Sequence, residues 1–411
     1  MTKKLHHQNG QEPAFAEARP TSDPTKFKQP HLSDNQLYKL INSGVQPVPE
    51  PAHTDAIDLI TIWGQSRGRE EESRIEKAGK IIFHMVGDTG STHGPKHQNE
   101  VADKLVLDFD DPESDRPSFL FHAGDVVYSF GEGKYYYDQF YEQYRDYPAP
   151  ITAIPGNHDG LIYKGDLGLD GKPAKSLAAF LRNFVANAPV PTDEAGGLVR
   201  TAMTQPGVYF CLDAPYVTII GLYSNVLEDP GVISSQGGKI SVLNDDQLIF
   251  LQKHLTRLKD LKDTSRAVII AVHHPPYAYS DSGHAGSPLM LADIDKSCAE
   301  ASFWPHAIIS GHAHNYQRFT RTKDNRDTPF IVCGNSGHNA QLLSKTKTIR
   351  TPMNVSDEVT FENYDDKNYG YLRLICDGKT LRIEYHDSNP DQKSESDAVT
   401  VNLKDYTMIA N

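Results

Sequence analysis

The sequence has little cysteine, no long apolar run and no excess of positive charge. Its four cysteines stand singly, without a CxxC pair, which argues against a zinc site built from thiolates. No apolar run approaches the roughly 20 residues that a membrane-spanning helix needs. The net charge of −13 argues against a nucleic-acid-binding surface, because such surfaces neutralise phosphates with Lys and Arg. Small phosphorylated molecules are not excluded as ligands, since a bound metal ion can supply the local positive field.

The amino-terminal part differs in composition from the rest of the chain. It starts MTKKLHHQNGQEP, with two lysines but no apolar segment behind them, so it lacks the pattern of a secretory signal and we expect a cytoplasmic protein. Residues 1–75 are rich in Pro, Gln, His, Ser and Asp, which predicts a partly disordered extension ending in a helix that docks on the domain. Residues 76–411 show no linker or internal repeat, and we expect them to form one domain.

Five short apolar runs are each followed at once by side chains that can bind metal ions. Short apolar runs bounded by glycine or proline are typical of buried strands, and α/β folds bind ligands at the carboxyl ends of such strands. The runs are IIFHMVGDTG (81–90), SFLFHAGDVVY (118–128), APITAIPGNHD (149–159), RAVIIAVHHPPY (266–277) and HAIISGHAHNY (306–316). The side chains offered at their ends are Asp88, Asp125, Tyr128, Asn157, His158, His273, His274, His312 and His314.

The segments between these runs have helical periodicity, which makes the whole pattern typical of an α/β fold. Asn99–Leu107 has helical spacing, and Asp245–Leu261 carries a leucine stripe. Lys134–Tyr147 places aromatic residues on one helical face, which favours a packed core face over a stacking platform for ligands.

The offered groups are carboxylate, amide, phenol and imidazole, without thiolate. This donor set suits hard or borderline transition ions. There are too many donors for one ion, so we expect two sites that share a bridging ligand. Centres with two metal ions stabilise both the attacking and the leaving oxygen of an in-line displacement. The residues therefore predict hydrolysis of a phosphate ester.

The order GDTG, GDVVY, GNHD, HHPPY, GHAHNY resembles the calcineurin-like metallophosphoesterases over roughly residues 80–320. That family generally has a histidine two places after the first aspartate, where this chain has Gly90. The purple acid phosphatases also lack this histidine, and in them a tyrosine three places after the second aspartate binds metal. Tyr128 stands at that position. The coupled change indicates a resemblance to the purple acid phosphatase-like branch.

The resemblance implies the fold and the metal ligands. The fold would be α/β, a metallophosphoesterase-type sandwich of two mixed β-sheets flanked by α-helices (α/β/β/α). The cofactors would be two metal ions, iron plus a second iron, zinc or manganese. The implied ligands are Asp88, Tyr128 and His314 for the first ion, Asp125 as the bridge, and Asn157, His273 and His312 for the second ion. His274 falls at a variable position of the family pattern.

The expected chemistry is attack on phosphorus by a metal-bound hydroxide, since two cations lower the pKa of bound water. The resemblance places His158 beside the leaving group as a proton donor, and we expect Asp159 to orient it. His284, in SDSGHAG, resembles a second histidine found after the fourth motif in this family. His338, in GNSGHNA, either lines the site or has only a structural role in its glycine-rich loop.

The interpretation that we favour is a phosphatase acting on phosphate monoesters, with a small phosphorylated substrate and neither nucleic acid nor membrane as partner. The alternatives are a phosphodiesterase acting on cyclic nucleotides or phospholipid head groups, and a catalytically silent metal-binding regulatory module. A Ser/Thr protein phosphatase is disfavoured, because GDVVYSFGEG replaces the arginine-rich continuation of the second motif. The sequence makes no prediction of oligomeric state or natural substrate.

Overall fold

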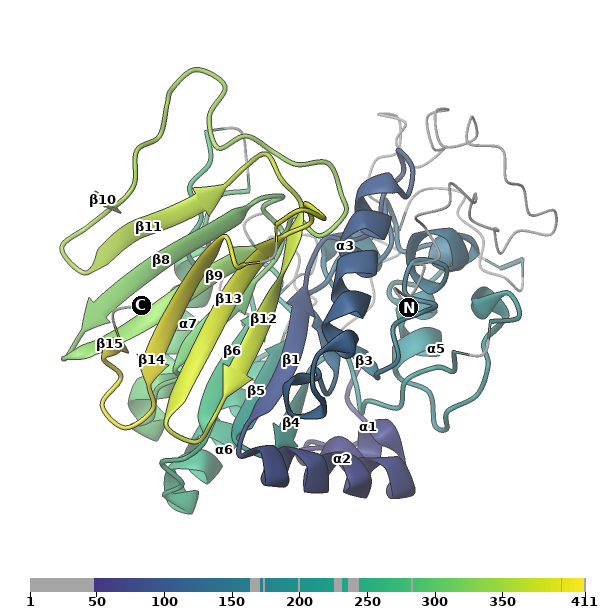
Figure 1. Ribbon diagram of the computed structural model, residues 1–411, viewed down its shortest axis with the longest axis horizontal. Helices are drawn as coiled ribbons and strands as arrows, with labels where there is room; N and C mark the ends of the chain where they lie inside the picture. Colours follow the sequence, from purple (N-terminus) through teal and green to yellow (C-terminus); the bar gives the residue numbers. More distant parts are fainter. Residues whose placement is uncertain are drawn as a thin grey trace.

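Two β-sheets pack face to face, with helices against their outer faces (Figure 1). The computed structural model describes residues 48–162, 171–172, 174–198, 200–224, 231–235, 244–281, 284–392 and 394–409. The predicted sandwich of two mixed sheets flanked by helices is confirmed.

The first sheet has the strand order β15-β14-β13-β12-β1-β2-β3. Strands β1, β2 and β3 run parallel, and β12 joins β1 antiparallel. The parallel part therefore delivers the ends of three strands to one edge. The strand bounds are β1 Ile81–Val86, β2 Leu120–His122, β3 Ile151–Ala153, β12 Gly370–Cys376, β13 Thr380–Asp387, β14 Asp397–Asn402 and β15 Met408–Ile409.

The second sheet has the strand order β10-β11-β8-β9-β7-β6-β5-β4. Its centre, β5, β6, β7 and β9, is parallel, and antiparallel strands flank it. The strand bounds are β4 Phe210–Ala214, β5 Val217–Leu222, β6 Ala267–Val272, β7 Ala307–Ser310, β8 Tyr316–Lys323, β9 Arg326–Cys333, β10 Met353–Asn354 and β11 Val359–Asp365.

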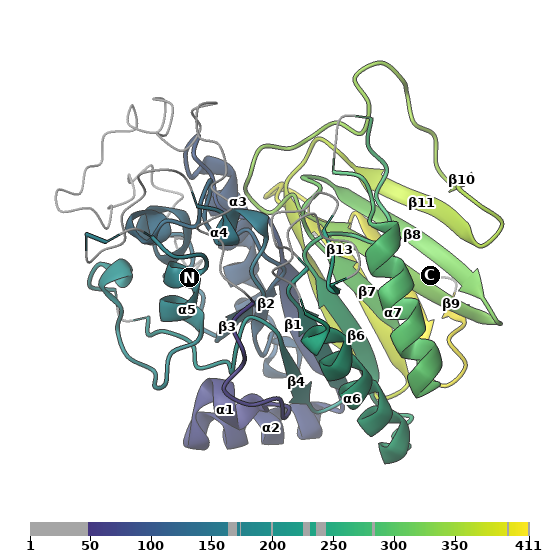
Figure 2. The ribbon, with the colours of Figure 1, turned by 180° about the vertical axis from the view of Figure 1, so that it is seen from behind.

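The helices cover the faces of the sheets that do not meet each other. Figure 2 shows α6 and α7 in front of the second sheet, and α3 packs its Val101 and Leu105 into the cluster that includes Val86 of β1. The helix bounds are α1 Leu59–Trp63, α2 Gln65–Ala78, α3 Lys96–Leu107, α4 Asn157–Gly160, α5 Ala178–Phe184, α6 Asp246–Leu261 and α7 Pro288–Ala301. Short turns add η5 Asp108–Asp110, η6 Glu113–Asp115, η7 Gly133–Tyr135, η8 Tyr137–Tyr141 and η9 Asp193–Ala195.

Alternation along the central strands divides the core into two layers. In β1, Phe83 and Met85 join the cluster between the sheets, whereas Val86 joins the cluster under the helices. In β6, Ile269 faces the space between the sheets and Ile270 faces the helices. Side chains of successive strand residues point to opposite faces, so strands buried on both faces must be apolar throughout.

The aromatic stripe of residues 134–147 forms a packed core face, as predicted. Tyr137, Phe140, Tyr141 and Tyr144 are all buried. The segment contains one turn of π-helix, η8, rather than a regular α-helix.

The amino-terminal part of the described chain docks on this core. Ile57 forms a parallel bridge with Leu212 of β4, and Leu59 and Ile75 are buried. Residues 1–47 lie outside the described residues, so the disorder expected there stays a prediction. Among the described residues, no helix has both the length and the apolar character required to cross a membrane.

Candidate metal centre

Three of the candidate ligands occur where the backbone turns sharply after a strand. Asp88, Asp125 and His312 have φ angles of 55°, 56° and 69°. Positive φ is uncommon outside glycine, and such strained residues cluster at functional sites. Hydrogen bonds between the loops hold the turns: Asp88 N donates to Gly124 O at 2.9 Å, and His312 N donates to Asp88 Oδ2 at 2.7 Å. The strand ends of the two sheets are thus tied together at one edge.

A first trio of atoms meets at the end of β1. Tyr128 OH lies 3.0 Å from Asp88 Oδ1 and 3.3 Å from His314 Nε2, and the last two atoms are 3.5 Å apart. Zinc-type ions sit about 2 Å from nitrogen and oxygen ligands, so such a triangle of donors suits one ion. Gln139 positions the tyrosine, since its side chain bonds both the N–H and the carbonyl of Tyr128 at 2.8 Å.

The structure gives a steric reason for the coupled change at Gly90 and Tyr128. A Cβ atom on Gly90 would lie 2.6 Å from Val126 O and 3.1 Å from Tyr128 Cδ2. The space that a side chain would need is therefore already filled. Any side chain at position 90 would first meet the carbonyl of Val126 and Oε1 of Gln139, the residue that positions Tyr128, each 2.6 Å from its Cβ.

A second trio meets beside the first. Asn157 Oδ1 lies 3.1 Å from His273 Nε2 and 3.0 Å from His312 Nδ1. His273 Nδ1 donates to the carbonyl of Ala123 at 2.8 Å, so in the neutral ring the lone pair of Nε2 faces Asn157 Oδ1 and Asp125 Oδ2, the latter 3.4 Å away. Acceptor atoms therefore point at one another across a small space.

Asp125 lies between the two trios and has a vacant acceptor. Its Oδ1 accepts the backbone N–H of His158 at 2.8 Å, whereas its Oδ2 is buried and has no donor among the described residues when Nε2 of His273, 3.4 Å away, carries no proton. Ligand atoms of Asp88, Asp125 and His273 all lie within 4.8 Å of one another. A buried acceptor without a donor is costly, and a cation relieves that cost.

The pKa shifts also indicate a place for positive charge. Burial raises the pKa of Asp88 well above its ordinary value. Burial alone would lower the pKa of His273, but the carboxylates of Asp125 and Asp88 outweigh it and raise this pKa to about 9. A proton thus takes a position that a metal ion can occupy instead, since metal binding displaces protons from its ligands. The residues present fit two metal ions with Asp125 between them.

His274 lies closer to this centre than its variable position in the sequence pattern suggests. Its ring is 4.1 Å from that of His312, and ligand atoms of His273, His274 and His312 lie within 4.8 Å of one another. His274 Nδ1 lies 2.9 Å from Ser224 Oγ, and its buried Nε2 makes no hydrogen bond with the described residues. The doubled histidine in HHPPY was the one signal for it in the sequence.

His158 lies at the rim, where the sequence placed it, but the predicted contact with Asp159 is wrong. His158 Nδ1 donates to Ser129 O at 2.7 Å, and its ring packs on Tyr128 with centroids 4.3 Å apart. Among the described residues, the Asp159 carboxylate accepts hydrogen bonds from the backbone N–H groups of Val126, Val127 and Gly156. Asp159 therefore joins the loops that carry Asp125 and Asn157 and does not hold the imidazole.

Two further histidines complete the surroundings. The ring of His284 lies 4.6 Å from His312 and 5.2 Å from His314. His338 stacks on Tyr128, with centroids 3.8 Å apart and ring planes 13° apart, and its Nδ1 donates to Gly90 O at 3.0 Å. Of the two uses considered for His338, the structure shows the one in which it lines the site.

Two histidines within the strands are buried and form hydrogen bonds inside the core. Gly124 N donates to His122 Nδ1 at 3.1 Å, so Nε2 of this ring donates to Thr89 Oγ1 at 2.8 Å. Burial lowers the pKa of His122 to about 3, which keeps it neutral. The ring of His84 is hydrogen-bonded through Nδ1 to the hydroxyl of Tyr147 and through Nε2 to the carboxylate of Asp108.

A two-sheet sandwich with acidic, amide, phenol and imidazole groups gathered at its strand ends defines a protein of the metallophosphoesterase class. The sequence comparison agrees: the calcineurin-like phosphoesterase family matches residues 83–316, more than half of the chain. The chain therefore belongs to the calcineurin-like phosphoesterases, and the predicted family is confirmed.

Within that family the chain is similar to purple acid phosphatases. It is 25% identical to purple acid phosphatase 22 of Arabidopsis thaliana over 159 residues, which are 38% of this chain and 34% of that protein. The match thus spans about a third of the relative. The structure of a purple acid phosphatase from yellow lupin (Lupinus luteus) seeds matches with a TM-score of 0.50 and 18% identity, covering 79% of this chain and 54% of the other.

A second solved structure shares the fold. GAP50, described as the anchor in the inner membrane complex of Plasmodium, matches with a TM-score of 0.53 and 14% identity, covering 79% of this chain and 89% of that one. At these identities the structural matches show the fold.

Proposed function

We propose that this protein is a dinuclear metal-dependent phosphatase that hydrolyses phosphate monoesters, in the manner of purple acid phosphatases. The observation that carries the proposal is the meeting of the two trios around Asp125, whose buried Oδ2 has no donor among the described residues unless His273 is protonated. Seven ligand-type side chains from five separate segments of chain converge there. Histidines that only stabilise the fold would not need carboxylate, amide and phenol groups gathered beside them.

In this proposal each trio holds one ion. Asp88, Tyr128 and His314 hold the first, Asn157, His273 and His312 hold the second, and Asp125 bridges them. The first set contains carboxylate and phenol oxygens, which suits iron, and the second is richer in nitrogen, which suits zinc, manganese or a second iron. Bound there, the pair would lower the pKa of water toward neutrality and stabilise charge on the phosphate oxygens.

The imidazoles at the rim would act on the substrate. Since Nδ1 of His158 donates to Ser129 O, Nε2 is the atom that would give a proton to the leaving alkoxide, and the ring must carry a proton on both nitrogens to do so and returns to its neutral form in the step. His284 and His338 line the other sides of the same space, next to His314. A dianionic monoester gains more than a monoanionic diester does from the imidazoles of His158 and His284 when these rings are protonated, and this supports the monoester as substrate.

Elemental analysis combined with a substrate pair tests the proposal. We expect about two metal ions per chain and faster turnover of nitrophenyl phosphate than of bis(nitrophenyl) phosphate. Asp125→Asn should lose both the second metal ion and the activity, whereas the control Asp293→Asn, buried in α7, should keep both. Faster turnover of the bis-ester would indicate a phosphodiesterase. Two bound ions without turnover of either ester would indicate a silent metal-binding module.

We also propose a reducing compartment, such as the cytoplasm. All four cysteines are buried as free thiols, which supports an environment where disulfides do not form. Labelling of the native and the unfolded chain with a thiol reagent tests this, since protein isolated without reductant should show four reactive thiols only after unfolding.

A further inference from the structure

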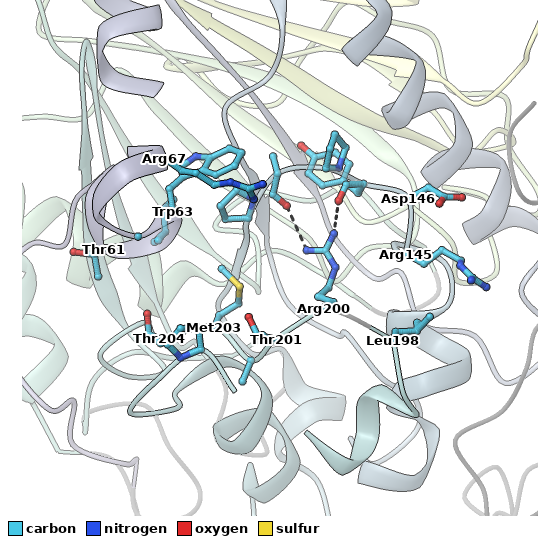
Figure 3. Close-up of a pocket in the computed structure, with 18 residues that line it drawn as sticks. Thr61, Trp63, Arg67, Arg145, Asp146, Leu198, Arg200, Thr201, Met203 and Thr204 are labelled. Atoms are coloured by element: carbon cyan, nitrogen blue, oxygen red, sulfur yellow. Dashed lines mark hydrogen bonds between the residues drawn. The ribbon is translucent and has the colours of Figure 1, made fainter. Parts of the chain in front are cut away.

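A cavity of about 650 Å³ lies away from the metal centre (Figure 3). Its walls come from α1 and α2, from the segment 145–150 that leads into β3, and from Leu198 and residues 200–204. Ligand pockets in proteins usually have volumes of about 300–1,000 Å³, so this cavity is large enough for a small organic molecule.

The cavity and the metal centre lie at opposite ends of the same strands. Ala149 and Pro150, which line the cavity, come just before β3, whereas Asn157 follows its carboxyl end. Trp63, another lining residue, donates its indole N–H at 3.0 Å to the carbonyl of Ser118, which precedes β2. None of the proposed metal ligands lines the cavity. A ligand bound there would therefore not touch the catalytic groups.

Arg200 brings an unneutralised positive charge to the cavity wall. Its guanidinium donates to the carbonyls of Tyr144 at 3.1 Å, Ala149 at 3.3 Å and Tyr147. In the described part of the chain, no carboxylate lies within ion-pair distance of it. Burial lowers the pKa of Arg200 to about 10, so the group is still charged at neutral pH. Its three carbonyl partners fix its position without cancelling its charge.

A second arginine faces the same space. In Figure 3, Arg67 from α2 extends toward the middle of the cavity, Arg200 directs its guanidinium to the carbonyls that accept its hydrogen bonds, and Arg145 points outward. Arg145 is engaged by Glu142 at 3.1 Å, but Arg67 forms no ion pair with the described residues. Asp146 is the one acidic residue among the described lining residues. This local positive surplus contrasts with the net charge of −13 of the whole chain.

The remaining walls are largely apolar. Trp63, Met203 and Leu198 line the cavity together with three prolines. The bond to Ser118 holds the indole of Trp63 in place, so a flat group can pack against a wall that is already ordered.

We propose that this cavity binds a small organic phosphate with an aromatic body, its phosphate between Arg67 and Arg200 and its ring against Trp63. Arg67 can bind phosphate oxygens through paired hydrogen bonds, whereas Arg200, whose Nη atoms bond three wall carbonyls, contributes its fixed positive charge and the one N–H that remains on these atoms. A charged head with an apolar body matches the two kinds of wall. The proposal concerns a second site and does not depend on the reaction at the metal centre.

Tryptophan fluorescence tests it directly. The chain has two tryptophans, and Trp304→Phe leaves Trp63 as the reporter while keeping an aromatic ring under Arg326. The probe is phenylphosphonate, whose P–C bond an ester hydrolase does not cleave. We expect saturable quenching of Trp63 in the full chain. Arg67→Glu should weaken this binding at least tenfold, whereas Arg69→Glu, the same charge change two residues along α2 and outside the cavity, should leave it within twofold.

Two results would overturn the proposal. One is absence of saturable quenching in the Trp304→Phe protein, and the other is an equal loss of affinity in both arginine variants, which would indicate a general charge effect. Inorganic phosphate that binds as tightly as phenylphosphonate would overturn the assignment of the ring to Trp63. The inhibition constant of phenylphosphonate against nitrophenyl phosphate reports on the metal centre alone and should be the same in wild type and Arg67→Glu. An inactive protein that still shows the quenching would refute the phosphatase and not this site.

Discussion

A single methyl group added at Gly156 should disable the metal centre without replacing any of the proposed ligands. Gly156 precedes Asn157 and has φ −97°, which any residue can adopt, so alanine causes no backbone strain there. Its Cβ, however, would lie 2.1 Å from Asp125 Oδ1 and 2.5 Å from the backbone nitrogen of Asp125. The collision involves backbone as well as side chain, so a rotation of the carboxylate alone cannot relieve it.

The size of the effect follows from these distances. An unstrained C···O contact is about 3.3 Å, so the bridging carboxylate and its loop must move apart from residue 156 by roughly 1 Å. A displacement of about 1 Å can cost about 100-fold in rate. Overpacking also costs about 1–3 kcal/mol of folding stability. We therefore expect Gly156→Ala to lower kcat about 100-fold and to bind fewer than two metal ions per chain, while it still folds.

The assay compares this variant with Gly207→Ala. A Cβ on Gly207 would also collide, 2.7 Å from Cβ of Pro51, but away from the metal centre. This control should lose stability in a thermal melt and keep kcat and metal content. If Gly156→Ala keeps wild-type kcat, KM and two metal ions, the bridging role of Asp125 and the tight packing around it are refuted.

Two further predictions concern a buried carboxylate and the tyrosine ligand. Burial alone would raise the pKa of Glu384, but hydrogen bonds from His386 and Arg382 outweigh it and lower this pKa from 4.5 to about 2. A lowered pKa stabilises the folded protein above pH 4.5, and the effect disappears as the pH falls through about 2. Glu384→Gln should therefore lower the unfolding free energy by about 3 kcal/mol at pH 7 and by clearly less at pH 3.5 in denaturant titrations. An equal loss at both pH values would contradict the assignment. For Tyr128→Phe, we expect loss of the visible absorption that a ferric ion beside a phenolate gives to the iron-loaded protein. A colourless iron-loaded wild type would show that Tyr128 is not an iron ligand.

Much of the fold and of the candidate centre was predictable from local patterns. The runs ending at Asp88 and Asp125 are apolar on both faces, which marks them as central strands before any contact is known. Their glycine-rich ends predict the turns that the structure shows. The absence of a histidine at position 90 and the presence of Tyr128 can also be read from the sequence, and the structure shows that the Val126 carbonyl and the Gln139 side chain leave no room for a side chain at Gly90.

Local sequence patterns could not predict the contacts of Asp159 and His338. Asp159 had a local alternative partner, and His338 contacts a residue far away in the chain. Asp159 follows His158 directly, but its carboxylate accepts hydrogen bonds from three backbone N–H groups, that of Gly156 before α4 and those of Val126 and Val127 in the loop after β2. His338 reaches Tyr128 because the loop after β9 returns to the end of β1, a path that no local pattern encodes.

By itself the sequence determined which metal-binding residue types stand at the strand ends and in which order. This was possible because strand periodicity and turn-forming glycines depend only on residues close together in the chain. The tertiary structure alone decided which of these groups come within a few ångströms of one another, because that depends on how parallel strands of two sheets align their ends. It also decided that Arg67 and Arg200, which belong to no common motif, face one cavity, since only the packing of α2 against the segment before β3 brings them together.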